Sequence, residues 1–221
     1  MEEHIQKTGD QSDTVFSSKY KAHYHSIHGA LEESIHVFIS AGLFHLHRKG
    51  YQRISIFEMG FGTGLNCYLT QMESLALNVS IDYHTIESDP IPAEVASKLN
   101  YPTLLSGSLE VFQQMHTLNW NTKHHLSDTF TLNKIKGQLE SYTATDTFDL
   151  IYYDAFAPSS QPHLWEKDIH EKLYKLLNPG GVLVTYCTQG AFRRTLESIG
   201  YRITKLNGPG KKREMMRATK P

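Results

Sequence analysis

Short apolar runs recur along this chain at intervals that suit a buried sheet. Residues 54–58 and 148–153 are almost entirely apolar, as parallel strands covered on both faces are. Residues 79–86, 130–136 and 182–186 also predict strands. The pattern therefore indicates a sheet built mainly from parallel strands.

Amphipathic stretches separate these strands and predict helices. Residues 30–50 carry apolar side chains at helical spacing, with two glutamates in the first turn and Arg48-Lys49-Gly50 at the end, as helix electrostatics and capping favour. Further helices are predicted over residues 65–75, 92–99, 108–118, 165–177 and 191–199. Residues 201–206 and 214–219 predict an antiparallel hairpin, because only a short loop joins them. The predicted fold class is α/β, with a mostly parallel sheet, helices on both faces and an antiparallel C-terminal hairpin.

Length and composition fit one globular domain. The chain has 221 residues, of which 39% are hydrophobic and 20% charged. Residues 1–20 are mostly polar and we expect them to be loose, so that residues 21–221 form a single domain. The formal net charge of −1 excludes a global basic field of the kind that announces nucleic acid.

The cysteine content and the N-terminal sequence indicate where in the cell the protein is expected. The only two cysteines, Cys67 and Cys187, do not make a disulfide scaffold. The polar N-terminus lacks the apolar segment of a signal peptide, and no apolar run approaches the length of a membrane span. We expect a cytoplasmic protein that is not associated with a membrane.

A glycine loop follows the first apolar strand. Gly60, Gly62 and Gly64 form G-F-G-T-G between that strand and the next helix, where glycine allows a tight turn and a close approach to a ligand. A dinucleotide-binding loop normally has the pattern G-x-G-x-x-G, whereas here the third glycine comes one residue early, which suits S-adenosylmethionine (SAM) better than a pyrophosphate. Glu87, at the end of the next strand, has the spacing of an acid that binds ribose hydroxyls. The alternative is a tight turn without a ligand, which the flanking strand, helix and acid disfavour.

A second motif, Asp154-Ala155-Phe156-Ala157-Pro158, follows the apolar strand 148–153. Ligands of open α/β sheets bind beyond the carboxyl ends of the strands, so Asp154 is placed where chemistry would occur. A carboxylate there suits methyl transfer to an amine, because it can orient the nitrogen. An ordinary Asp, with a pKa near ~3.9, is a weak base for an alkylamine, so orientation and charge stabilisation are favoured over deprotonation. The alternative role is a cap on the following helix.

Four blocks in the right order resemble a known family. They are residues 24–38, G-F-G-T-G-L-N at 60–66, D-A-F-A-P at 154–158 with Trp165 following, and G-P-G-K-K-R-E-M at 208–215. Together they resemble the class I methyltransferases represented by the N-terminal half of MnmC, which make 5-methylaminomethyl-2-thiouridine at the tRNA wobble position. The resemblance implies SAM as the methyl donor and 5-aminomethyl-2-thiouridine in tRNA as the acceptor. It also implies a stand-alone methyltransferase of the MnmD type, without the flavin-dependent oxidase of MnmC and supplied with its aminomethyl substrate by another enzyme system.

The resemblance and the motifs together predict the site residues. Asp154 is the expected catalytic residue. The predicted cofactor contacts are Glu58, Gly60, Gly62, Gly64, Asn66, Glu87, Gln138 and Asp154. The predicted substrate contacts are Tyr24, Phe156, Pro158, Trp165, Lys211, Lys212 and Arg213, with the aromatic rings of Phe156 or Trp165 stacking on the base and the basic loop contacting tRNA phosphates. One departure is Gly137-Gln138, where the family usually has Gly-Asp, because glutamine can still accept a hydrogen bond from an adenine amino group but carries no charge.

Other interpretations of these residues stay open at this level. The basic loop is on its own most often a solvated surface. The 13 histidines lack the paired spacing of a zinc site, and no metal is expected. A small-molecule amine methyltransferase of the same fold, or a non-catalytic RNA-binding module, would share most of these features.

Overall fold

Alternating strands and helices build one large sheet in this computed structural model, which describes residues 4–143, 146–208 and 214–221. The sheet has eight strands in the order β10-β11-β9-β8-β4-β5-β7-β6. They are β4 (Arg53–Met59), β5 (Ser80–Glu87), β6 (Thr122–Ser127), β7 (Phe130–Lys136), β8 (Phe148–Tyr153), β9 (Leu177–Thr185), β10 (Arg202–Asn207) and β11 (Glu214–Thr219). The five strands β9, β8, β4, β5 and β7 are parallel, and β6, β11 and β10 pair antiparallel. This confirms the class I SAM-dependent methyltransferase fold and its antiparallel C-terminal hairpin.

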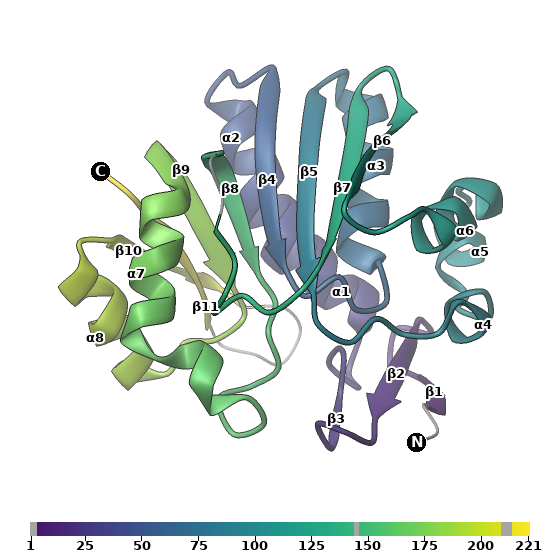
Figure 1. The fold of residues 1–221 in the computed structure, drawn as a ribbon, viewed down its shortest axis with the longest axis horizontal. Helices are drawn as coiled ribbons and strands as arrows, with labels where there is room; N and C mark the ends of the chain where they lie inside the picture. Colours follow the sequence, from purple (N-terminus) through teal and green to yellow (C-terminus); the bar gives the residue numbers. More distant parts are fainter. Residues whose placement is uncertain (1–3, 144–145, 209–213) are drawn as a thin grey trace.

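Helices cover both faces of the sheet (Figure 1). They are α1 (Ala30–Ser34), the π-helical η1 (Ile35–Leu43), α2 (Phe44–Arg48), α3 (Leu65–Leu77), α4 (Ala93–Ala96), α5 (Tyr101–Leu104), α6 (Leu109–Thr117), the 3-10 turn η2 (Pro162–Trp165), α7 (Lys167–Leu176) and α8 (Gly190–Ile199). Side chains alternate along each strand, so Ile54 and Ile56 of β4 join the core under η1 and α3, whereas Phe57 and Met59 join the core under α7 and α8. Among the described residues, no helix has the length and hydrophobicity that crossing a membrane requires.

The N-terminal segment corrects one expectation. Residues 1–20 were expected to be loose, yet β1 (His4–Lys7), β2 (Asp13–Ser17) and β3 (Ala22–His23) form a small antiparallel sheet. Its polar side chains are used inside the structure: Thr8, Asp10 and Ser12 accept hydrogen bonds from the first backbone N–H groups of α1. These side chains satisfy donors that every helix start leaves unpaired. The polar residues that suggested a loose segment therefore cap a helix.

This small sheet is placed over the carboxyl ends of the central strands (Figure 1). Asp13 and Asn100 exchange two backbone-to-side-chain hydrogen bonds of 2.9 Å, and the Tyr101 hydroxyl donates to the Asp13 carbonyl over 2.7 Å. These bonds join the small sheet to the segment after β5. The chain between β3 and α1 is consequently held across the edge of the large sheet where ligands of this fold class bind.

Three other boundaries differ from the sequence expectations. The helix expected over residues 92–99 is one turn, Ala93–Ala96. The strand β6, Thr122–Ser127, was not expected, because its sequence TKHHLS is mostly polar at an exposed sheet edge. The strand expected over residues 182–186 begins earlier, because Asn178-Pro179-Gly180-Gly181 lies inside β9, where the pairing with β8 shifts register and Gly180 has a φ of 78°.

Candidate active site

The glycine turn after β4 forms the base of the site. Gly60, Gly62 and Gly64 have φ angles of 88°, 50° and 75°, a region that residues with a side chain adopt at a cost. A Cβ atom at Gly62 would lie 2.9 Å from Cδ1 of Tyr24. The Gly60 N–H donates to the Ile86 carbonyl over 3.0 Å, which holds the turn against the end of β5. The turn thus brings bare backbone to the carboxyl edge of the sheet.

Glu87 ends β5 beside this turn. One carboxylate oxygen accepts a hydrogen bond from the Gly62 N–H over 3.2 Å, and the other accepts from the Asp89 N–H over 2.8 Å. Burial raises the pKa of Glu87, while these backbone donors oppose that rise. Each carboxylate oxygen can accept further bonds, so the side chain suits a pair of sugar hydroxyls.

Asp154 follows the last residue of β8, the strand next to β4 in the sheet. The Asn66 amide, in the first turn of α3, donates to its Oδ2 over 2.8 Å. The helix that begins at the glycine turn therefore also orients the carboxylate expected to be catalytic. This link between the two motifs is a contact that sequence spacing alone does not predict.

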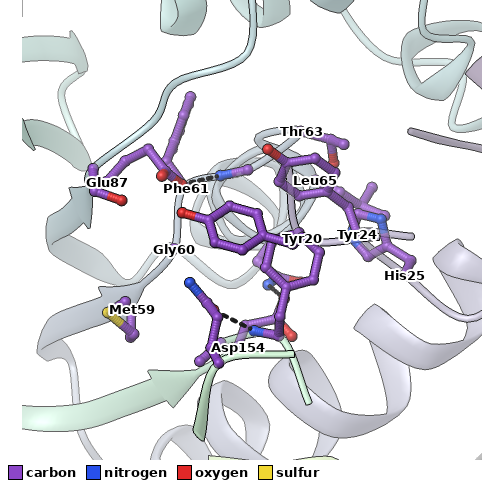
Figure 2. Close-up of a pocket in the computed structure, with 16 residues that line it drawn as sticks. Tyr20, Tyr24, His25, Met59, Gly60, Phe61, Thr63, Leu65, Glu87 and Asp154 are labelled. Carbon is purple, nitrogen blue, oxygen red and sulfur yellow. Dashed lines mark hydrogen bonds between the residues drawn. The ribbon is translucent and has the colours of Figure 1, made fainter. Parts of the chain in front are cut away.

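A pocket joins these groups, with about 530 Å³ of empty space that includes open solvent at its mouth. Its lining includes the turn from Met59 to Thr63, together with Leu65, Asn66, Glu87, Ser88, Asp154, Ala155, Phe156, Gln161, Tyr20, Tyr24 and His25. Figure 2 shows Glu87, Gly60 and Met59 toward one side of the pocket and Tyr24 and His25 toward the other, with Tyr20 between them. The strand ends supply its polar groups and the N-terminal segment supplies its aromatic cover.

Three aromatic rings form that cover. The Phe156 ring stacks on Tyr20 with centroids 4.8 Å apart and contacts Tyr24 at 4.9 Å. The backbone of Phe156 is fixed from both sides, because its N–H donates to Gln161 Oε1 over 3.0 Å and its carbonyl accepts from the Trp165 indole over 2.8 Å. The rings therefore rest on a firmly anchored loop.

Several predicted residues meet in this pocket and several do not. Tyr24, Gly60, Gly62, Asn66, Glu87, Asp154 and Phe156 line it, and Gly64 begins α3 beneath it. Trp165 does not line it: this side chain is buried against Tyr153 and Phe192, so it positions Phe156 and offers no face to a base. Pro158 and the exposed Gln138 also lie outside the lining, which leaves the predicted adenine contact of Gln138 without support. Lys211, Lys212 and Arg213 fall outside the described residues.

Sequence reasoning missed Tyr20, His25 and Gln161. Tyr20 lies in the segment expected to be loose, and His25 is one of the 13 histidines that the sequence assigns to no site. His25 is 9% exposed, and burial lowers its pKa to about 4, so it is neutral at pH 7. Among the residues that the structure describes, no group of three or more His, Cys, Asp or Glu side chains is arranged to hold a metal ion.

Glu58 was predicted to contact the cofactor, but it lies beneath the pocket and is fully buried. It faces α3 and pairs in register with Thr85 of β5. Neither carboxyl oxygen forms a hydrogen bond of good geometry. Thr85, Tyr83 and Asn66 are nevertheless near enough to lower the pKa of Glu58. Burial, followed by the charge of Asp154, outweighs these neighbours and raises the pKa of Glu58 well above its usual range. We therefore infer an uncharged carboxyl under the glycine turn.

Replacing Glu58 with glutamine should change how stability depends on pH. The pKa of Glu58 is higher in the folded protein than in the unfolded chain. Its contribution to the stability of the wild type is therefore complete below about pH 4.3, the reference pKa of Glu, and is lost as the pH rises toward the folded-state pKa. Glutamine does not titrate, so the free energy of unfolding of Glu58→Gln relative to the wild type should rise by about 1.4 kcal/mol per pH unit in that window. Urea unfolding at pH 5, 6 and 7 measures this, with the exposed Glu110→Gln as the surface control. A difference that does not vary with pH would show that Glu58 is not held neutral.

The pocket fits SAM on chemical grounds. A side chain at Gly62 would crowd the Tyr24 ring, so the bare backbone of the turn leaves room for a ligand against α3. Glu87 offers a carboxylate for hydroxyls, and the polar side chains of Asn66 and Asp154 lie near the adjoining strand end. A nucleoside with a charged, amino-acid-like arm uses this combination of groups.

Comparisons with known proteins agree with this assignment. A family model described as S-adenosyl-L-methionine-dependent methyltransferase matches residues 103–221. The chain is 29% identical over 217 residues to the tRNA 5-methylaminomethyl-2-thiouridine biosynthesis bifunctional protein MnmC of Ralstonia nicotianae, covering 94% of this chain and 33% of that protein. The same-named protein of Pseudomonas entomophila is 27% identical over 226 residues, covering 97% of this chain and 35% of that protein.

A solved structure supports the fold. The crystal structure of MnmC2 from Aquifex aeolicus superposes with a TM-score of 0.77 at 21% identity, covering 100% of this chain and 72% of that one. The chain spans about a third of the length of the curated relatives named above. Because the family model matches more than half of the chain, the chain belongs to the S-adenosyl-L-methionine-dependent methyltransferases.

Proposed function

We propose that this enzyme transfers a methyl group from SAM to the aminomethyl nitrogen of 5-aminomethyl-2-thiouridine at the wobble position of tRNA, giving 5-methylaminomethyl-2-thiouridine. The observation that carries the proposal is the placement of Asp154 in the pocket of the glycine turn, oriented by Asn66. The MnmC relatives are named for the biosynthesis of 5-methylaminomethyl-2-thiouridine in tRNA, and this product indicates the acceptor. We expect the enzyme to act in the cytoplasm, on tRNA.

The chain's own residues supply orientation and charge. SAM, when bound, supplies a methyl group on a positively charged sulfur and leaves as a neutral thioether. Asp154 accepts a hydrogen bond from the acceptor amine and points the nitrogen lone pair toward the donor side of the pocket. As the new N–C bond forms, the nitrogen becomes positive, and the Asp154 carboxylate stabilises that charge until a proton leaves to solvent. Asn66 fixes the carboxylate in place.

The aromatic cover contributes by excluding water. The Phe156 ring is stacked on Tyr20 and tilted against Tyr24 over the pocket, and these rings suit a planar base. Removing water strengthens the interaction between Asp154 and a cationic amine.

Phosphate contacts remain a separate part of the proposal. Among the described basic residues near the C-terminal hairpin, Lys205 pairs with Glu214 over 2.9 Å and Arg217 donates to the Ala41 carbonyl over 3.3 Å. Arg193 lies 4.0 Å from Glu197 on α8. These groups are already engaged within the chain, so we assign the tRNA contact mainly to Lys211, Lys212 and Arg213, which lie outside the described residues.

Nucleoside mass spectrometry of cellular tRNA tests the proposal. Cells that lose the protein should accumulate 5-aminomethyl-2-thiouridine and lack its N-methyl form, whereas cells that regain it should recover the methylated nucleoside. Regaining the Asp154→Ala variant should not restore it. An unchanged nucleoside profile, or methylation of a free amine metabolite in its place, would contradict the tRNA assignment.

A further inference from the structure

A second hollow adjoins the SAM pocket on the side of the N-terminal segment. It has about 500 Å³ of empty space, including open solvent at its mouth, and its own walls include Glu33 and Tyr186. Tyr24, His25, Ala155 and Phe156 line both spaces. The second hollow, here called the Glu33 hollow, therefore lies directly beside the pocket that contains Asp154.

Glu33 gives this hollow its charge. It lies in the first turn of α1 and is only 7% exposed. Its Oε1 accepts a hydrogen bond from the Ser26 N–H over 3.1 Å, which ties α1 to the loop that carries His25. His25 is neutral at pH 7, because burial lowers its pKa to about 4, so it does not offset the carboxylate.

Tyr186 connects the Glu33 hollow to the catalytic loop. This residue follows β9, and its hydroxyl donates to the Ala155 carbonyl over 2.8 Å. Burial raises the pKa of its phenol, and the negative charges of Asp154 and Glu33 raise it further. Both carboxylates therefore lie near enough to Tyr186 to act on one phenol.

The charge and the aromatic side chains of the Glu33 hollow indicate which kind of ligand it would bind. A buried carboxylate disfavours phosphate and favours a cation. The rings of Tyr24, Phe156 and Tyr186 favour a planar base, which stacks on aromatic side chains. A pyrimidine with a protonated aminomethyl group has both properties, because an alkylamine has a pKa near that of lysine, about 10.4, and is charged at neutral pH.

We propose that the Glu33 hollow is the acceptor site, in which Glu33 attracts the ammonium group of the modified uridine and Tyr24 and Phe156 hold its ring beside Asp154. This inference rests on the proposed function, since it names the place where that function's substrate docks. The tRNA phosphates stay outside this negative hollow. Glu33 contacts the ammonium form to bind it. The nitrogen then loses one proton to solvent, which frees the lone pair that Asp154 orients at the transfer step.

Neighbouring glutamates on α1 provide a matched test. Glu33→Gln removes the buried charge and keeps an amide oxygen for the Ser26 N–H, whereas Glu32→Gln removes the same charge from an exposed position in the same turn. Glu33→Gln should raise KM for tRNA bearing 5-aminomethyl-2-thiouridine on the order of ten-fold, with a SAM Kd within about two-fold of the wild type. Glu32→Gln should leave both constants unchanged.

Binding of free nucleosides separates a direct contact from a structural one. The wild type and Glu32→Gln, saturated with S-adenosylhomocysteine, should bind 5-aminomethyluridine on the order of ten-fold more tightly than uridine, measured by calorimetry. Glu33→Gln should lose that preference. Equal preference in both variants, or no preference in the wild type, overturns the acceptor site, and the wild-type result stands even if Glu33→Gln does not fold.

The two proposals fail in different ways. Methyl transfer to tRNA that does not depend on Glu33 contradicts the acceptor site and leaves the function intact. A Glu33-dependent preference for the amino nucleoside, without methyl transfer to tRNA, contradicts the function and leaves the site intact.

Discussion

Asp154→Ala is expected to lower kcat for methyl transfer by about 10²–10⁴-fold while the SAM Kd stays within about three-fold of the wild type. The carboxylate orients the amine and stabilises the positive charge that forms on nitrogen, so its loss acts on the transfer step. Asn66 would lose its acceptor, but the glycine turn and Glu87 would keep their contacts. Single-turnover kinetics with saturating SAM, together with calorimetric SAM binding, measures the two effects separately.

Two further variants sharpen this result. Asp154→Asn keeps the shape and an acceptor for Asn66 but loses the charge, so a comparable fall in kcat would show that charge is the effective property. Asp128→Asn removes an exposed carboxylate in the turn between β6 and β7, at the opposite edge of the sheet, and should behave as the wild type. Wild-type turnover in Asp154→Ala would contradict the role given to this residue.

Gly62→Ala is expected to weaken SAM binding by at least ten-fold. The new Cβ would lie 2.9 Å from Tyr24, whose ring lines the pocket, and the φ of 50° is unfavourable for alanine. The strained turn should also misplace the N–H that donates to Glu87. SAM titration by calorimetry measures the loss.

Gly50 provides the matched control. It follows α2 with a φ of 93°, and a Cβ there would meet no atom within 4 Å. Gly50→Ala therefore carries the backbone strain alone, on the order of 1–2 kcal/mol, and should lower stability without changing SAM affinity. If both variants bind SAM as the wild type does, the glycine turn is not the SAM cradle.

Much of the sheet could be predicted from local pattern. The strands over residues 130–136 and 148–153 have the predicted bounds. Residues 148–153 are a nearly continuous apolar run, as buried parallel strands are, and residues 130–136 alternate between buried and half-buried positions up to Lys136. The polar strand β6 and the small N-terminal sheet lack that signal. Thr8 and Ser12 are buried because they cap a helix 20 residues away, a relation that no local pattern contains.

The residues of the site also fall into those that local sequence motifs predict and those that they do not. Gly60, Gly62, Glu87 and Asp154 belong to motifs at strand ends, and the sheet order brings them together as expected. Tyr20 and His25 reach the pocket only because the N-terminal sheet folds across that edge. Trp165 and Glu58 have suitable chemistry at suitable sequence positions, yet packing buries both outside the pocket. Chemical type and spacing could predict where the strands end, but not which side chains the covering segment adds.

The most direct test of the account uses purified protein, methyl-labelled SAM and tRNA that carries 5-aminomethyl-2-thiouridine. The account predicts that label enters this nucleoside as one methyl group on the aminomethyl nitrogen, and that tRNA lacking the aminomethyl group takes up none. A preparation that binds SAM but leaves the aminomethyl nucleoside unlabelled would contradict it.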